Sequence, residues 1–478
     1  MLFNSLSFAL FLPILFFCYW YLTNKKLIFQ NILLLGASYF FYACWDYRFL
    51  FLLIFSTLLD FFTGLKMQDA KTANVKKRWF CISLLINVGF LAVFKYFNFF
   101  VESLASALFT LGFKVNNFTL KIILPIGISF YTFHGLSYVI DIYKNKIKAE
   151  KNFINYSLFV SFFPLLVAGP IERATHLLPQ IKAQRTFNYT KAVDGLRQIL
   201  WGLFKKIVIA DTCATYSNLI FDNATNYNGS TLVIGAVFFA FQIYCDFSGY
   251  SDIALGAARL FGIELLKNFS FPYFSRDIAE FWRRWHISLS SWFRDYLYIP
   301  LGGSKGGKWM SIRNTLIIFL VSGFWHGANW TFIIWGAIHA CYFLPLLLLK
   351  RNRSNLDIVA KGKIFPNVKE FFSMILTFML STFAWIFFRA KSLQDAFVFV
   401  KKIFSKTILS VPQELPKTLF VLLCLFILIE WIGRESNFAI EKLFLKRSMP
   451  FRLLFYAFLF FCIFIFAGKE QSFIYFQF

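Results

Sequence analysis

The sequence is poor in charged residues, and acidic residues are the scarcest. Charged side chains make up 15% of the 478 residues, against about 25% in ordinary soluble domains, while 58% of the residues are hydrophobic. Only 24 residues are acidic, against 49 lysines and arginines. This composition excludes an ordinary soluble fold. No polar stretch is long enough to form a separate domain, so we expect 1–478 to be a single membrane domain.

Long stretches of the chain lack Asp, Glu, Lys and Arg altogether. A membrane-spanning helix needs about 20 mostly apolar residues, because each residue advances it by about 1.5 Å across roughly 30 Å of hydrocarbon. The stretches that meet this requirement are Met1 to Asn24, Leu27 to Trp45, Ile122 to Ile140, Phe153 to Ile171, Asn223 to Cys245 and Phe371 to Phe388. Asn314 to Leu349 is too long for one helix and predicts two segments with a break between them.

Shorter apolar runs raise the predicted number of membrane segments to roughly eleven or more. These runs are Phe49 to Leu59, Trp79 to Phe94, Thr418 to Ile429 and Leu453 to Gly468. The sequence therefore predicts an all-α, polytopic fold with additional re-entrant and interfacial helices.

The formal net charge of +25 does not indicate a nucleic-acid partner. The positive residues lie in short loops between apolar runs, as at 76–78, 144–148, 350–353 and 446–447. Such loops are expected to face the cytoplasm and its anionic lipid surface. The charge therefore indicates a multi-pass protein whose first partner is the lipid bilayer.

Patterns typical of metal sites, disulfide frameworks and inverted repeats are missing. The eight cysteines are scattered without a CxxC pair, and none of the five histidines lies at metal-ligand spacing from another ligand. We therefore expect metal-free chemistry. The chain also lacks matching halves broken by Gly and Pro, which weakly disfavours a transporter.

His326 is the first candidate for chemistry. It lies at the expected break inside 314–349, between Gly323 and Gly327. An ionisable group at membrane depth must find a polar partner or a water-filled cavity, and an imidazole poised near neutral pH can deprotonate an attacking hydroxyl. A hydrogen-bonded core histidine is an equally good interpretation of its position alone.

His286 lies in the most polar stretch, Lys267 to Arg313, which is nonetheless rich in aromatic residues. Apolar residues recur there at helical spacing, which predicts one interfacial or partly embedded helix. These residues are Trp282, Trp285, Leu289, Trp292 and Phe293. His286 flanks this stripe and can reach inward, but its position alone favours simple packing. His134, His176 and His339 are also expected to serve packing or interface placement.

Two carboxylates follow a long uncharged span. Asp246 and Asp252 are six residues apart, so they do not share a helical face, which argues against a cooperating pair. Buried carboxylates are costly unless paired. We expect a structural role, with partners in the region of Arg283 or Arg294.

Five motifs give the chain a recognisable identity at the family level. They are PIGISFYTFHGLSYVID from Pro125, AGPIER from Ala168, DFSGYSDIALGAARLFGI from Asp246, EFWRRWHISLSSWFRDYLYIPLGGS from Glu280 and SGFWHGANW from Ser322. Together they resemble the membrane-bound O-acyltransferase family, and more narrowly its bacterial alginate O-acetylase-like and peptidoglycan O-acetylase branch. The resemblance covers most of the chain and is densest over 242–335.

The resemblance implies an activity and a set of site residues. It assigns His326 as the family's invariant histidine and His286 as its second signature position, both catalytic. Asn329, Asp246, Asp252, Arg294 and Asp295 are expected as supporting residues. The implied body surrounds a central tunnel that admits a cytoplasmic acyl thioester, with acetyl-coenzyme A or an acyl carrier as donor and no permanently bound cofactor.

The resemblance also implies a location and a protein partner. We expect a bacterial inner (plasma) membrane protein that works with a periplasmic or extracellular esterase-like (SGNH) acetyltransferase. The C-terminal tail, 469–478, resembles the closing segment of small partner peptides in D-alanylating relatives, so Tyr475 could relay the acyl group. An aromatic tail anchored at the interface is the competing interpretation.

The leading hypothesis is O-acetylation of an envelope polysaccharide, either alginate-like exopolysaccharide or peptidoglycan. D-alanyl transfer to teichoic acid and a polysaccharide export component without catalysis are the alternatives. The sequence does not choose among the glycans.

Overall fold

The computed structural model describes residues 1–23, 26–113, 119, 124–125, 127–167, 169–468 and 471–474. Their regular structure is helical throughout, without a strand among them, which confirms the predicted all-α fold. The chain divides into two compact units, Met1–Val193 with Ala257–Leu266 and Asp194–Gly256 with Lys267–Phe478. This division reflects packing density, and the single domain expected over 1–478 stays a prediction.

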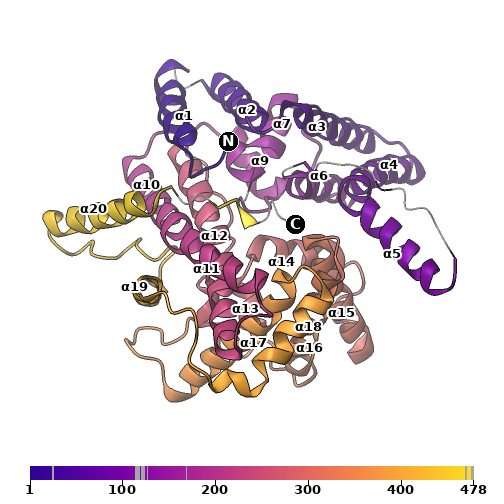
Figure 1. Ribbon diagram of the computed structural model, residues 1–478. Helices are drawn as coiled ribbons and strands as arrows, with labels where there is room; N and C mark the ends of the chain where they lie inside the picture. The colour runs from indigo at the N-terminus through magenta and orange to yellow at the C-terminus, as the bar shows by residue number, and fades with distance from the viewer. Residues whose placement is uncertain are drawn as a thin grey trace. The chain divides into compact units, whose positions relative to one another are not determined.

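The first unit is built from helices of very different lengths (Figure 1). Its helices are α1 Leu6–Phe17, α2 Leu27–Ala43, α3 Tyr47–Gln68, α4 Ala73–Leu91, α5 Phe97–Thr110, α6 Ile128–Tyr143, α7 Phe153–Ser161, α8 Phe163–Leu166 and α9 Ala174–Lys182. Single π-helical turns, η1 Cys18–Leu22 and η2 Ala92–Tyr96, extend α1 and join α4 to α5. Helices α3, α4 and α6 pack against one another.

A buried carboxyl group organises the packing of α3, α4 and α6. Asp60 Oδ1 accepts hydrogen bonds from Ser83 Oγ at 2.6 Å and from Asn87 Nδ2 at 2.8 Å. Gly135 of α6 lies against the same carboxylate, because a Cβ there would stand 2.0 Å from Asp60 Oδ2. The glycine therefore lets α6 approach a polar cluster that joins the other two helices.

The uncharged stretch from Phe153 to Ile171 is not one continuous helix. Helix α7 ends at Ser161, Phe162 leaves the helical region with ψ 117°, and α8 starts anew at Phe163. Pro164 accounts for the break, because it lies in the first turn of α8, where its missing N–H costs no helical hydrogen bond.

The second unit contains most of the longest described helix, α12 Gly229–Leu260. Its helices are α11 Asp211–Asp222, α13 Ile278–Arg284, α14 Ile287–Phe293, α15 Gly307–His326, α16 Trp330–Leu348, α17 Val368–Arg389, α18 Leu393–Ile403, α19 Lys417–Gly433 and α20 Met449–Phe466. The shorter turns are η3 Phe204–Ala210, η4 Pro272–Phe274, η5 Arg294–Tyr298 and η6 Lys406–Leu409. Helices α10 Tyr189–Leu203 and α12 Gly229–Leu260 contribute residues to both units.

Six helical segments of the described chain are long and apolar enough to cross a membrane. They are Tyr47–Gln68, Ala73–Thr110, Gly229–Leu260, Trp330–Leu348, Val368–Arg389 and Met449–Phe466. Two shorter apolar segments, Leu6–Leu22 and Leu27–Ala43, accompany them. The polytopic character is confirmed, whereas the count of eleven or more spans and the central tunnel stay predictions.

Candidate active site

The break expected inside 314–349 is present, and it separates α15 from α16. Two glycines allow these helices to approach closely. A Cβ on Gly323 would stand 2.2 Å from the carbonyl oxygen of Phe332, and one on Gly336 would stand 2.3 Å from that of Phe319. Small residues at a helix crossing let the two backbones come into contact, because no bulky side chain separates them. The pair forms a close helical hairpin whose first helix ends at His326.

His326 is the last residue of α15 and is buried. Its ring lies 4.8 Å from that of Trp325, 5.2 Å from that of Trp335 and 5.2 Å from that of Phe388. Trp335 belongs to α16 and Phe388 to α17, so three helices surround the imidazole. Aromatic side chains from all three helices therefore enclose the imidazole.

Asn329 fixes the start of α16, three residues after His326. Its side-chain oxygen accepts the Thr331 backbone N–H at 3.0 Å, as a helix N-cap does. Its amide nitrogen donates to the carbonyl oxygen of Lys391, just beyond α17, at 3.0 Å. Asn329 therefore ties the hairpin connection to the segment that follows α17.

His286 lies at a break, so the single interfacial helix predicted across 282–293 is wrong. The chain forms two short helices, α13 and α14, and His286 between them adopts a left-handed conformation with φ 41°. Such a conformation is unusual for a non-glycine residue and is often found at functional sites. Of the five residues at this spacing, four are buried and Trp282 is half-buried. The spacing did not reveal the turn between the helices.

Trp325 connects the surroundings of the two histidines. Its ring centroid lies 6.0 Å from that of His286 and 4.8 Å from that of His326. Phe247 of α12 packs edge-on against His286 at 4.7 Å. The structure therefore brings both predicted histidines into one buried aromatic cluster of the second unit.

A buried ion network holds α13 in place. Glu280 accepts from Arg276 Nε at 3.0 Å and from Arg284 Nη2 at 2.8 Å. Arg276 also pairs with Asp357 at 2.9 Å and with Glu370, the third residue of α17, at 3.2 Å. The hydrogen bond from Arg276 lowers the pKa of Asp357, which lies in the loop between α16 and α17.

Asp246 has a different partner from the one expected. Its carboxylate lies 2.8 Å from Lys206 Nζ and accepts the backbone N–H of Ile474 at 2.7 Å. Arg283 instead donates to the carbonyl oxygens of Asn352 and Asn355. The expectation that the Arg283 or Arg294 region holds this carboxylate is wrong, because a lysine of η3 lies directly against α12.

Asp252 pairs with the neighbouring lysine in the same turn. Lys205 Nζ lies 2.6 Å from Asp252 Oδ2, and Gln198 donates to the other oxygen at 2.7 Å. As predicted from their spacing, the two carboxylates do not form a dyad: each has its own lysine. Arg294 pairs with its neighbour Asp295 at 2.7 Å, and the Arg294 side chain is largely exposed.

The segment 471–474 reaches the aromatic cluster through α12. The Phe473 ring lies 4.4 Å from that of Tyr250 and 6.2 Å from that of Phe247, which packs on His286. Tyr475 and the rest of 475–478 lie outside the described residues, as do 469–470.

The remaining histidines lie in packed or hydrogen-bonded positions. His339 Nδ1 accepts from Trp282 Nε1 at 3.3 Å and His134 is buried in α6. In the first unit, His176 Nδ1 lies 2.8 Å from Glu172, whose hydrogen bond raises the pKa of the imidazole. The described residues contain no group of three or more His, Cys, Asp or Glu side chains that could hold a metal ion.

Lys206 is the site residue that the sequence reasoning missed. It lies in the otherwise apolar run WGLFKKIVIA, from Trp201 to Ala210. Ionisable residues inside such runs usually pair or serve function. The two lysines in this apolar run therefore indicate ion pairs, which the structure shows with Asp252 and Asp246.

Comparison with known proteins decides the family. A model of the membrane-bound O-acyltransferase family matches residues 144–388, about half of the chain, including both histidines. The chain belongs to the membrane-bound O-acyltransferase family. It is therefore a multi-pass membrane O-acyltransferase.

Several members of this family are similar over most of the chain. A probable alginate O-acetylase AlgI of Pseudomonas aeruginosa is 39% identical over 85% of this chain and 75% of its own length. A peptidoglycan O-acetyltransferase of Helicobacter pylori is 38% identical over 84% of this chain and 79% of its own length. A teichoic acid D-alanyltransferase of Bacillus subtilis is 29% identical over 45% of this chain and 58% of its own length.

Proposed function

We propose that this O-acyltransferase moves an acetyl group from a cytoplasmic thioester, acetyl-coenzyme A or an acyl carrier, for O-acetylation of an envelope polysaccharide. The observation that carries the proposal is the enclosure of His326 at the α15–α16 break by Trp325, Trp335 and Phe388. The similarity to an alginate O-acetylase and a peptidoglycan O-acetyltransferase supports acetyl as the group and a glycan as the acceptor.

The chemistry assigned to His326 is general base catalysis. The neutral imidazole takes the proton of the attacking hydroxyl while its oxygen adds to the thioester carbonyl. Collapse of the tetrahedral intermediate breaks the carbon–sulfur bond, and the imidazolium returns the proton to the departing thiolate. Such proton transfer typically contributes about 10² to 10⁴ in rate.

His286 is assigned the second role at the same site. Its ring shares Trp325 with His326, and Phe247 supports it from α12. His286 lies at the left-handed turn between α13 and α14, and its side chain is buried. Asn329 and Asp246 are positioning residues, because one anchors the connection after His326 and the other anchors the C-terminal segment.

Tyr475 is proposed as the first acceptor of the acyl group. Its phenolic oxygen, deprotonated by His326, attacks the thioester and forms an aryl ester, and the thiol leaves. A second hydroxyl then attacks that ester and regenerates the phenol. The hydrogen bond between Ile474 N–H and Asp246 supports this role, because it holds the residue next to Tyr475 in the chain against α12.

The location and the partner follow from the same proposal. An inner-membrane enzyme that passes an acyl group outward needs an acceptor on the far side. We propose an esterase-like (SGNH) acetyltransferase in the periplasm or outside the cell, which completes delivery to the polysaccharide. The donor binds as a substrate, so no permanently bound cofactor is required.

Replacement of His326 tests the proposal directly. His326→Ala in the full-length protein should reduce donor-dependent acetylation by about 10² to 10⁴ and leave export of unmodified polymer intact. Trp309→Ala is the matched control, because Trp309 is exposed on the same helix. Full acetylation by His326→Ala contradicts the catalytic assignment, and loss of export favours a transport component instead.

The relay has its own test. Mass spectrometry of the full-length protein after incubation with donor should find an acetyl adduct on Tyr475 that base treatment removes. Tyr475→Phe should abolish both the adduct and the transfer. A Tyr475→Phe protein with full activity removes the relay while leaving His326 as the base.

D-alanyl transfer is the second candidate for the group moved, because a teichoic acid D-alanyltransferase matches 45% of the chain. Ester-linked acetate and D-alanine measured in purified wall and capsule fractions, with and without this protein, separate the two. The fraction that loses acetate also identifies the acceptor as exopolysaccharide or peptidoglycan.

A further inference from the structure

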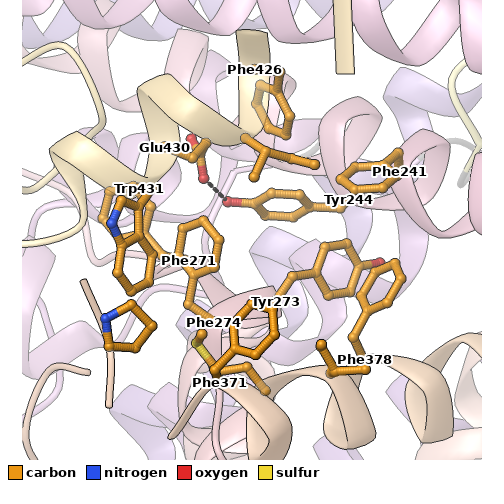
Figure 2. A pocket seen from close by; sticks show the side chains of 14 residues that line it. Phe241, Tyr244, Phe271, Tyr273, Phe274, Phe371, Phe378, Phe426, Glu430 and Trp431 are labelled. Atoms are coloured by element: carbon orange, nitrogen blue, oxygen red, sulfur yellow. Dashed lines mark hydrogen bonds between the residues drawn. The ribbon is translucent and has the colours of Figure 1, made fainter. Parts of the chain in front are cut away.

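A cavity of about 380 Å³ lies in the second unit, and its lining includes neither His286 nor His326. Helices α12, α17 and α19 and the turn η4 form its walls, and nine of its fourteen lining residues are aromatic (Figure 2). Its volume is within the range of small-molecule pockets. It is therefore large enough to hold an extended apolar group.

The cavity offers a ligand almost only hydrocarbon surface. Glu430 is the acidic residue in its lining, and its carboxylate is already hydrogen-bonded. Tyr244 Oη donates to it at 2.7 Å and Trp201 Nε1 at 3.3 Å. The Tyr273 hydroxyl points to the backbone and donates to the Ala240 carbonyl oxygen at 2.6 Å. The polar atoms of the wall are engaged within the protein, so an apolar occupant is favoured.

The cavity opens on the outer surface of α17 and α19. Three lining residues on these helices, Phe371, Ile375 and Ile427, are exposed by 48%, 39% and 38%. Both helices are apolar, and α17 is long enough to cross the membrane. In a membrane protein, such a surface contacts lipid, so the group that enters the cavity comes from the bilayer.

A basic segment lies at one end of the opening. The sequence from Lys361 to Lys369 reads KGKIFPNVK, and its three lysines are exposed. Ile364, Phe365 and Val368 are also exposed between them. Exposed bulky apolar residues among lysines are typical of a segment that lies at an anionic membrane surface.

This segment is held against the cavity. Trp431, which lines the cavity, donates from Nε1 to the carbonyl oxygen of Ile364 at 2.8 Å. Pro366 also lines the cavity, so Lys363 and Lys369 each lie three residues from a lining residue. Lys363 and Lys369 are therefore held near the opening of the cavity.

The acidic groups close to this segment are already engaged. Asp357 and Glu370 pair with Arg276, at 2.9 and 3.2 Å. Glu435 lies 4.0 Å from Arg434 Nη2 and accepts the backbone N–H of Gly362 at 2.7 Å. The positive charge of the lysines is therefore available to an external anion.

We propose that this cavity binds one acyl chain of an anionic phospholipid, with the lipid phosphate against Lys363 and Lys369. The chain fills the aromatic cavity, and the glycerol lies at the opening between α17 and α19. The back wall, Tyr244 and Tyr273, packs on Trp285, at 6.1 and 6.0 Å. Trp285 precedes His286, so the lipid supports the wall behind that histidine.

Photo-crosslinking tests the site. The full-length protein is placed in nanodiscs of phosphatidylcholine with phosphatidylglycerol that carries a diazirine on one acyl chain. Irradiation and mass spectrometry should locate adducts on the peptides with Met374 and Ile427, both lining residues. Met374→Trp fills the cavity and should reduce these adducts about tenfold. Ile427→Trp is the second variant, from the opposite wall.

The controls separate the cavity from the general lipid surface and identify the headgroup. Met379→Trp, exposed on the same helix, should leave the adducts unchanged. Lys363→Glu combined with Lys369→Glu should reduce labelling by the anionic probe about tenfold, whereas Lys417→Glu, exposed at the start of α19, should not. Adducts insensitive to both tryptophan variants overturn the site. Equal labelling by a phosphatidylcholine probe overturns the anionic headgroup.

Discussion

Lys206 Nζ lies 2.8 Å from a carboxylate oxygen of Asp246, and both side chains are almost fully buried. Lys206 also pairs with Asp211 at 2.7 Å and donates to the carbonyl oxygen of Gln471 at 3.0 Å. The other Asp246 oxygen accepts the N–H of Ile474. Two charged residues from η3 and α12 therefore hold the C-terminal segment by its backbone, beside the residues that support His286.

Removal of the Asp246 carboxylate should release that segment. In Asp246→Ala, Lys206 keeps Asp211 as a partner, but Ile474 N–H loses its acceptor. A hydrogen bond to a charged group contributes about 1.5–3 kcal/mol, so amide exchange at 473–474 should accelerate by about tenfold or more. Hydrogen–deuterium exchange of the detergent-solubilised protein measures this change.

Asp252→Ala is the matched control for this variant. It removes a different carboxylate from the same helix. The partners of that carboxylate are Lys205 and Gln198. Exchange at 473–474 should stay at the wild-type rate. Equal acceleration in both variants would mean that loss of any α12 carboxylate loosens the tail, and the specific anchor would be refuted.

Close packing of α15 against α16 makes Gly323 intolerant of a methyl group. In Gly323→Ala the new Cβ would stand 2.2 Å from the carbonyl oxygen of Phe332, so the backbones must separate. Overpacking of this kind typically costs about 1–3 kcal/mol. Thermal unfolding in detergent should show a lower midpoint, and acyl transfer should fall because His326 shifts with the hairpin.

Gly89→Ala provides the comparison for that substitution. Gly89 lies inside α4, and a Cβ there meets no atom within 4 Å. The alanine should be neutral or stabilise the helix by about 0.5–1 kcal/mol. A similar loss of stability in both variants would show that the effect does not come from the contact between α15 and α16, and the crossing would be refuted as its cause.

Glu280 should be among the most sensitive residues outside the histidine pair. Its buried carboxylate lies between the guanidinium groups of Arg276 and Arg284. Glu280→Ala removes the carboxylate that pairs with Arg284 and leaves Arg276 with Asp357 and Glu370. Breaking a buried pair costs about 3–5 kcal/mol. The unfolding midpoint should fall strongly. Asp357→Asn alters the same network at a carboxylate that is 66% exposed, so its effect should stay below about 1 kcal/mol.

The local rules of the sequence predicted the helices well and the turns poorly. The length of the runs without charged residues predicted α2, α15, α16 and α17. In lipid, a chain satisfies its backbone hydrogen-bonding groups mainly by forming a helix. The prediction failed at Phe162, where Pro164 starts a new helix, and at His286, where helical spacing continues across a left-handed residue. Spacing records which residues are buried, not whether the backbone between them stays helical.

The sequence predicted that the buried carboxylates pair with cations, but it did not predict which cations. The cost of burying Asp246 and Asp252 required cations, and the structure supplies them. The choice of Lys206 and Lys205 over Arg283 and Arg294 depends on how η3 packs on α12, which no periodicity of a single segment encodes. The catalytic assignment of His326 came from family resemblance, because its position alone suits a core residue equally well.

The pair of His176 with Glu172 predicts a pH dependence of stability in the first unit. The hydrogen bond that His176 donates to Glu172 raises the pKa of His176 above about 6.5, the usual value in an unfolded chain. A raised value in the folded state means that the pair stabilises fully below about pH 6.5 and that this stabilisation is lost as the pH rises through the folded-state value. The His176 side chain is 37% exposed, so the contribution should be below about 1 kcal/mol.

Comparison of wild type with His176→Gln over a pH series measures the contribution of the His176–Glu172 pair to stability. The difference between their unfolding midpoints should be largest at the acidic end and shrink toward alkaline pH, because only the protonated imidazole forms the ion pair. Glu172 also accepts the N–H of Leu266 at 2.6 Å, and the glutamine variant leaves that bond in place. A difference that stays constant across the series, or that grows with pH, would show that His176 is neutral in the folded protein.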